Sequence, residues 1–120
     1  MASILILEDN LNLLGLYGRV LQSHGHHVDT VPTLEEADEL LGQVLYNVFI
    51  CDMNIGTTNA VQLLLYWANT LEQNGTRIAI ISSDWDYDKV AAELGIEVFV
   101  AKPIQPSELI PLVDHLLTQN

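Results

Sequence analysis

Five short apolar runs, each followed by an amphipathic stretch, constrain the fold of this chain more than any other feature of its sequence. The run at residues 78–81 is apolar at every position, which is typical of a strand covered on both faces in a parallel sheet. The runs that predict strands are residues 4–7, 28–31, 48–51, 78–81 and 98–100. Strands that alternate with helices predict one α/β domain, with helices on both faces of a five-stranded sheet.

The stretches between and after these runs carry apolar side chains at helical spacing. The predicted buried stripes are Leu13, Leu16, Tyr17, Val20 and Leu21; Leu34, Ala37, Leu41, Val44 and Leu45; Val61, Leu64, Leu65, Ala68 and Leu71; Val90, Ala91 and Leu94; and Leu109, Leu112, Val113, Leu116 and Leu117. The residues that predict helix boundaries are Gly25, Gly75 and Gly95 at ends, and Thr33, Asp84 or Asp86, and Ser107 at starts. Five helices are therefore expected.

The charge of the chain excludes some classes of partner. Sixteen acidic residues against four basic ones give a formal charge of -12. Contact with nucleic acid or with an anionic membrane needs Lys or Arg to neutralise phosphates, so we expect neither partner to bind directly. The apolar start at residues 4–7 is too short for a signal peptide, and no run reaches the ~20 residues of a membrane span. We therefore expect a cytoplasmic protein.

Polar side chains follow four of the five predicted strands. In chain order they are Glu8 and Asp9, then Asp52 with Asn54, then Ser82 and Ser83, then Lys102 with Pro103. Because the carboxyl ends of parallel strands meet at one edge of a sheet, these groups should converge there. Three carboxylates brought together repel one another unless a cation or a lysine neutralises them. Ligands with oxygen atoms alone point to a hard divalent ion such as Mg²⁺.

Four segments of the sequence resemble the receiver domain of bacterial two-component response regulators (CheY-like). They are Ile-Leu-Ile-Leu-Glu8-Asp9-Asn10, Val-Phe-Ile-Cys-Asp52, Ile-Ala-Ile-Ile-Ser82-Ser83 and Val-Phe99-Val-Ala-Lys102-Pro103. Asp52 lies 43 residues after Asp9, Ser82 lies 30 after Asp52, and Lys102 lies 20 after Ser82, which is similar to that family. The resemblance covers residues 1–120 and implies a single domain with a flavodoxin-like, doubly wound parallel sheet of strand order 2-1-3-4-5.

The resemblance also implies a role for each acidic residue of this edge. Asp52 would accept a phosphoryl group from a sensor histidine kinase or a phosphotransfer protein. Glu8 and Asp9 would hold Mg²⁺ together with Asp52 and the backbone carbonyl of Asn54. The protein would then be a phosphorylation-controlled signalling switch, which catalyses only its own phosphoryl uptake and loss.

Further residues would hold the phosphoryl group and transmit its presence. Lys102 and Ser82 would each contact a phosphoryl oxygen, and a cis peptide before Pro103 would direct Lys102. After phosphorylation Ser82 would move and Phe99 would turn inward. The altered surface, from the fourth helix to the fifth, would dock a downstream effector domain or protein, or form a homodimer.

The segment after Asp52 departs from the family pattern. The family usually has Pro and Gly where this chain has Gly56 and Ala60, which predicts a more mobile loop over residues 54–59. Ser83 stands where the family mostly has Ala. These departures leave the phosphoryl lifetime open. The cognate kinase, the output, and whether the receiver acts alone or with an effector domain are open as well.

Three other functions compete with the phosphorylation switch. The first is a receiver-like interaction module that works without phosphate. The presence of all five site residues argues against it: Glu8, Asp9, Asp52, Ser82 and Lys102. The second is a small Mg²⁺-dependent phosphatase, which generally needs a second acid where this chain has Asn54. The third is flavin binding, which needs a phosphate-binding loop in place of Glu8 and Asp9.

Two further features have ordinary structural interpretations. His24, His26 and His27 follow a predicted helix end and are expected to be solvated cations near a negative helix dipole. Cys51 is the single cysteine, so it cannot form an internal disulfide, and its place in a strand predicts a buried thiol.

Overall fold

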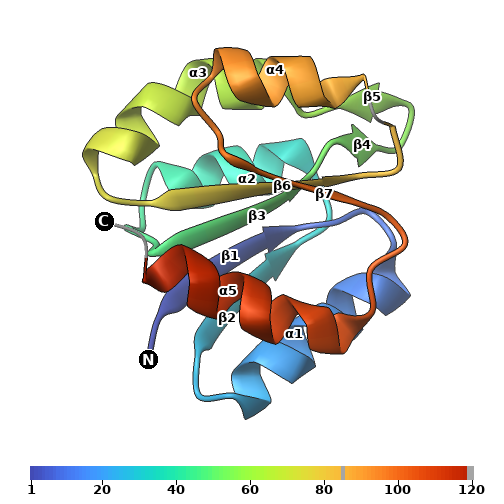
Figure 1. Ribbon diagram of the computed structural model, residues 1–120, viewed down its shortest axis with the longest axis vertical. Helices are drawn as coiled ribbons and strands as arrows, with labels where there is room; N and C mark the ends of the chain where they lie inside the picture. The colour runs from blue at the N-terminus through green and yellow to red at the C-terminus, as the bar shows by residue number, and fades with distance from the viewer. Residues whose placement is uncertain (85, 119–120) are drawn as a thin grey trace.

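A five-stranded parallel sheet forms the centre of the computed structural model, which describes residues 1–84 and 86–118 (Figure 1). Its strands are β1 (Ser3–Leu7), β2 (His27–Val31), β3 (Val48–Asp52), β6 (Arg77–Ser82) and β7 (Val98–Ala101). They lie in the order β2-β1-β3-β6-β7. Two further strands, β4 (Asn54–Ile55) and β5 (Thr58–Asn59), form a separate small hairpin. The order of the five main strands is therefore the expected 2-1-3-4-5, which confirms the predicted fold class.

Helices cover both faces of the sheet, as predicted. They are α1 (Leu11–Ser23), α2 (Leu34–Leu41), α3 (Val61–Gln73), α4 (Tyr87–Glu93) and α5 (Leu109–Leu117), with a 3₁₀ turn at Pro106–Glu108. Figure 1 shows α2, α3 and α4 on one side of the sheet and α1 and α5 on the other. Within residues 1–84 and 86–118, no helix has both the length and the apolar character that crossing a membrane requires.

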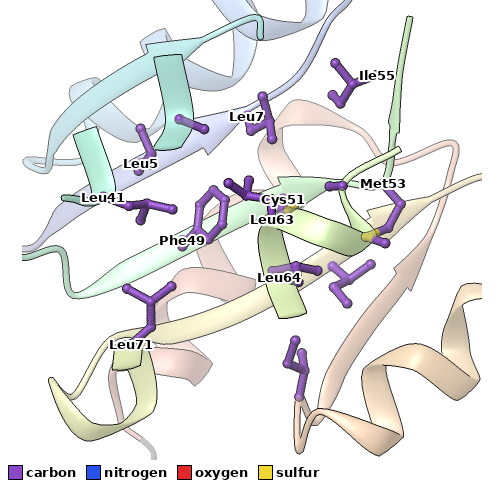
Figure 2. Close-up of a cluster of buried hydrophobic side chains, with 14 of the residues drawn as sticks. Leu5, Leu7, Leu41, Phe49, Cys51, Met53, Ile55, Leu63, Leu64 and Leu71 are labelled. Carbon is purple, nitrogen blue, oxygen red and sulfur yellow. The ribbon is translucent and has the colours of Figure 1, made fainter. Parts of the chain in front are cut away.

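Strand alternation divides the core into two clusters. Along β3, Phe49 and Cys51 face α2, α3 and α4, whereas Val48 and Ile50 face α1 and α5. Figure 2 shows Phe49 and Cys51 among leucines that come from β1, α2 and α3. Cys51 is completely buried, which confirms the expected buried thiol. Burial, and secondarily the nearby charge of Asp52, raises the pKa of the Cys51 thiol, so this group stays protonated and unreactive.

Two glycines of α1 should respond in opposite ways to replacement by alanine. A Cβ on Gly18 would lie 2.9 Å from Cγ2 of Thr30, whereas a Cβ on Gly15 would have only Arg19 nearby, at 3.7 Å. Gly18→Ala should therefore destabilise the fold by about 1–2 kcal/mol through overpacking against β2. Gly15→Ala should stabilise it by about 0.5–1 kcal/mol, because alanine favours the helix. Urea unfolding of both variants checks this, and equal effects would contradict the packing.

The predicted helical stripes are correct in outline and wrong at particular positions. Helix α2 ends at Leu41 with Gly42 as its C-cap, so Leu45 lies beyond the helix and is 75% exposed. Val44 also lies outside that helix. Leu16 and Leu65 are exposed, and Leu14 and Leu63 are buried in their place. A run of neighbouring leucines satisfies more than one helical phase, so spacing alone did not select the buried members.

The predicted helix starts have mixed outcomes. Thr33 caps α2, where its hydroxyl accepts a hydrogen bond from the Glu36 amide. Asp86 precedes α4 without a side-chain cap bond, and its own amide donates to the Asp84 carboxylate at 2.9 Å. The prediction that a helix starts at Ser107 is wrong. Ser107 lies inside the 3₁₀ turn that Gln105 caps, and α5 begins two residues later. Trp85, between the two aspartates, lies outside the described residues.

His26 is not a solvated cation, contrary to expectation. Its Nδ1 accepts a hydrogen bond from the Ala2 amide at 3.1 Å. Its Nε2 is buried and has no hydrogen-bond partner within residues 1–84 and 86–118. Burial is the main cause that lowers the pKa of His26 below its ordinary value of 6.5, and the positive amino terminus adds to it. The folded protein therefore favours the neutral ring.

This histidine should make the fold less stable in mild acid. Because the folded-state pKa is lowered, the unfolded chain binds more protons below 6.5, and stability falls as the pH drops through that window. The unfolding free energy of wild type relative to His26→Asn should therefore decrease from about pH 7 to about pH 5.5. Chemical denaturation at each pH measures the difference. A constant difference would contradict the prediction, and His24→Asn is the matched control for a neighbouring exposed ring.

Candidate functional site

Charged side chains at the carboxyl ends of three strands meet around one lysine. Glu8 directly follows β1, Asp52 is the last residue of β3, and Lys102 directly follows β7. The Lys102 Nζ donates hydrogen bonds to Glu8 Oε1 at 2.7 Å and to Asp52 Oδ2 at 2.9 Å. The lysine therefore joins residues that lie 94 and 50 positions away in the chain.

Three carboxylates form an acidic cluster beside this lysine. Oxygen atoms of Glu8, Asp9 and Asp52 all lie within 4.8 Å of one another. Glu8 and Asp52 are only 1% and 3% exposed, whereas Asp9 is exposed to solvent. One lysine cannot neutralise three carboxylates, so the cluster keeps an excess of negative charge that attracts a cation. An all-oxygen donor set of this kind, open to water on one side, fits a hexacoordinate ion such as Mg²⁺.

Backbone amides hold each carboxylate in place. The Asn10 amide donates to Glu8 Oε2 at 3.0 Å, and the Asn54 amide donates to Asp52 Oδ1 at 3.2 Å. The Gly56 amide donates to Asp9 Oδ2 at 2.7 Å. Charge-assisted hydrogen bonds of this type fix the rotamers of the acids without neutralising them. The cluster is therefore oriented before any cation binds.

Burial and pairing act against each other on the charges of the site. Burial raises the pKa of Glu8 to about 7, even though hydrogen bonds from Lys102 and from the Asn10 amide act to lower it. Burial alone would lower the pKa of Lys102, but its hydrogen bonds to Glu8 and Asp52 outweigh this effect, and the pKa is raised. Lys102 therefore stays charged at neutral pH. Burial disfavours the negative charge of Glu8, which is why its pKa is raised.

Ser82 lies beside the acidic cluster at the end of β6. Its Oγ is within 3.4 Å of Asn54 Nδ2, which donates to it, and it accepts a second hydrogen bond from the Asp84 amide at 3.0 Å. The Lys102 amide donates to the Ser82 carbonyl at 2.9 Å, which ties the two strand ends together. The peptide bond between Lys102 and Pro103 is cis. Phe99 lies on the neighbouring strand β7. Its side chain is half-buried and packs against the hydrophobic core under α2, α3 and α4.

The segment after Asp52 is a hairpin instead of the predicted loop. Strands β4 (Asn54–Ile55) and β5 (Thr58–Asn59) pair antiparallel, and Gly56 turns between them with φ of 60°. This left-handed conformation suits glycine, and it directs the Gly56 amide toward Asp9. The contribution of Gly56 to the site is a feature that the sequence reasoning missed. A lone glycine shortly after the nucleophile candidate was the available signal.

The fold is similar to that of solved receiver domains and response regulators. A CheY-like response regulator receiver domain from Methanospirillum hungatei superposes with a TM-score of 0.88 at 18% identity, covering 98% of this chain and 94% of the other. The response regulator TrrA from Thermotoga maritima, solved in complex with Mg²⁺-BeF, has a TM-score of 0.82 at 22% identity, covering 98% and 100%. At these identities the likeness establishes the shared fold.

Sequence relatives and the family profile identify the family itself. The transcriptional regulatory protein PmrA from Pectobacterium parmentieri is 27% identical over 117 residues, which are 98% of this chain and 53% of PmrA. The aerobic respiration control protein ArcA from Escherichia coli K12 is 26% identical over 118 residues, covering 98% and 49%. The chain thus spans about half the length of the curated relatives it matches. The profile of the response regulator receiver domain matches residues 4–114. Together with the acidic cluster, this match shows that the chain belongs to the receiver domain family of two-component response regulators.

Proposed function

We propose that Asp52 accepts a phosphoryl group from a sensor histidine kinase or a phosphotransfer protein. The observation that carries this proposal is the shared hydrogen bonding of Lys102 to Asp52 and Glu8 inside a cluster of three carboxylates. A lone buried carboxylate is a poor nucleophile, because an approaching phosphoryl group is also negative. The positive charges of Lys102 and of a bound cation would offset that repulsion.

The acidic cluster would hold Mg²⁺ through Glu8, Asp9 and Asp52, with the backbone carbonyl of Asn54 as a further ligand. The support is the donor set itself, since the cluster offers oxygen atoms only and exceeds the charge that Lys102 can balance. When bound, the ion supplies positive charge that offsets the repulsion between the carboxylates and the phosphoryl oxygens.

The residues of the chain would then divide the work of transfer. An Asp52 oxygen attacks the phosphorus of a phosphohistidine, an O–P bond forms as the N–P bond breaks, and the imidazole nitrogen keeps the electron pair and takes a proton from water. Lys102, which now holds the Asp52 carboxylate at 2.9 Å, has a flexible stem that lets its ammonium follow the charge onto a phosphoryl oxygen. Ser82 would donate a hydrogen bond from its hydroxyl to another phosphoryl oxygen.

Ser82 and Phe99 would transmit phosphorylation from Asp52 to the surface of the domain. If the Ser82 hydroxyl turns toward the phosphoryl group, it leaves its present partners, Asn54 and the Asp84 amide. The half-buried ring of Phe99 would then turn inward, and the surface formed by α4, β7 and α5 would change. That surface would dock an effector domain or protein, or a second copy of the domain. Such a receiver is a cytoplasmic signalling domain, with residues 1–120 as its single unit, rather than a turnover enzyme.

Beryllofluoride tests this proposal, because with Mg²⁺ it mimics a phosphoryl group on a carboxylate. Wild type should gain about 2 kcal/mol of stability at saturating ligand and melt several degrees higher. Asp52→Asn should show no shift, and Asp88→Asn, an exposed acid of α4, should respond as wild type does.

The interaction module and the phosphatase predict different results. An unresponsive wild type would favour the phosphate-independent interaction module. An equal shift in Asp52→Asn would place the ligand elsewhere and contradict the proposed role of Asp52. Repeated turnover of a phosphate ester would favour the phosphatase.

A further inference from the structure

A groove between α2 and α3 has no part in the proposed phosphorylation chemistry. Its volume is about 430 Å³, and it is lined by Asp38, Glu39, Gly42, Gln43, Tyr66 and Trp67. The two helices lie on the same side of the sheet (Figure 1). The lining combines two aromatic rings from one helix with two carboxylates from the other, which is the composition of a site for an organic cation.

The aromatic wall of the groove is fixed in place. Trp67 Nε1 donates to Asp38 Oδ1 at 2.7 Å, and the Trp67 ring packs partly against the hydrophobic core. Tyr66 meets Trp67 edge to face, with ring centroids 5.3 Å apart and an interplanar angle of 79°. A Cβ on Gly42 would lie 3.8 Å from the Trp67 ring, so the glycine keeps the space beside the indole free of side chain. The rings are therefore positioned before any ligand arrives.

The helices that form the groove carry negative charge and no positive charge. Helices α2 and α3 contain no Lys or Arg, whereas α2 alone contains four acidic residues. Glu39 lies in the last turn of α2, where the helix dipole disfavours negative charge. Within the described residues, the Glu39 carboxylate has no hydrogen bond or ion pair. A cation in the groove would therefore supply the counter-charge that the fold does not provide.

Tyr66 is 74% exposed, so the groove presents a large aromatic side chain to solvent. Tyrosine, tryptophan and arginine are enriched among the residues that carry most of the binding energy of a protein interface. An exposed tyrosine in the lining of an acidic groove thus fits a polypeptide that carries arginine better than a small free cation.

We propose that this groove binds an arginine side chain from a basic segment of a partner protein. A guanidinium is planar, so it can lie on an aromatic face while its N–H groups donate to the carboxylates of Asp38 and Glu39. A lysine ammonium offers no such stacking. The interaction is independent of Asp52 and needs no phosphoryl group, so it would serve recognition of a partner in either state of the receiver.

The test is a titration of ¹⁵N-labelled, unphosphorylated protein with an end-blocked glycine peptide that contains arginine. The indole N–H signal of Trp67, assigned with Trp67→Phe, should shift in a saturable way at physiological salt. Tyr66→Ala and Glu39→Gln should each weaken binding about five-fold, which is the size expected for one cation–π contact or one charge-assisted contact. Both side chains are exposed, so neither variant should disturb folding.

Two controls separate a built site from general attraction to an acidic protein. Glu35→Gln removes the same charge from the same helix but lies outside the groove, and it should weaken binding less than about two-fold. A peptide with neutral citrulline in place of arginine should bind at least about five-fold more weakly. Equal losses in Glu35→Gln and Glu39→Gln, equal binding of the citrulline peptide, or an unmoved Trp67 signal would overturn the proposal. None of these outcomes would affect the proposed role of Asp52.

Discussion

Replacing Lys102 by methionine should destabilise the folded protein by about 3 kcal/mol in the absence of divalent cations. Methionine keeps most of the length of the side chain and removes its charge. The change leaves Glu8 and Asp52, whose side chains are 2% and 4% exposed, without a counter-charge. The loss should lie at the lower end of the range for broken buried pairs, because Glu8, with its pKa raised to about 7, can take up a proton.

Urea unfolding with and without Mg²⁺ measures this effect. Magnesium should restore part of the lost stability, since a cation in the acidic cluster would replace the missing positive charge. Lys89→Met is the matched control, because Lys89 is exposed on α4, and it should change stability by no more than about 0.5 kcal/mol. A loss no larger than that of Lys89→Met would show that the lysine does not stabilise the cluster.

Asp9→Asn should weaken Mg²⁺ binding by at least about ten-fold, since even residues that only orient metal ligands typically cost that much. Asp9 is the exposed member of the acidic cluster, so its replacement should leave the core intact. The Gly56 amide can still donate to an amide oxygen of the asparagine, which preserves the local geometry. Isothermal titration calorimetry, with Mg²⁺ titrated into the protein, measures the affinity.

The control for this experiment is Asp88→Asn, which removes the same charge from the first turn of α4. Its Mg²⁺ affinity should match that of wild type. If both variants lost affinity equally, the cation would be responding to the charge of the whole chain and the acidic cluster would not be its site.

The order of the strands followed from the resemblance to receiver domains. Strand β2 carries polar Asp29 and Thr30 between its valines, whereas the other four strands of the sheet could be predicted from the sequence as short apolar runs. The run ending at Ile81 is an example, since it is buried on both faces of the sheet. Helix limits were harder to predict. Leu45 continues the helical spacing of α2, yet the chain leaves the helix at Gly42, because the following segment must enter β3. Periodicity reports the face of a helix and not its length.

The acids and the lysine of the site could be predicted because a parallel sheet brings its strand ends to one edge. The contacts among these side chains could not be predicted. Which oxygens Lys102 bonds, and that the Gly56 amide holds Asp9, depend on backbone conformations between distant segments. The same holds for the indole of Trp67, which meets Asp38 across 29 positions of sequence. His26 was misjudged because its ring accepts a hydrogen bond from the Ala2 amide, a contact across 24 positions of sequence that periodicity does not reveal.

The central claim is that Asp52 is the phosphoryl acceptor. It is tested most directly by incubating the protein with Mg²⁺ and acetyl phosphate and locating the added phosphoryl group by mass spectrometry of rapidly quenched peptides. The account predicts one phosphoryl group on the peptide that contains Asp52, and none on that peptide in Asp52→Asn. A phosphoryl group found on any other residue of the wild-type protein, or none at all, would contradict it.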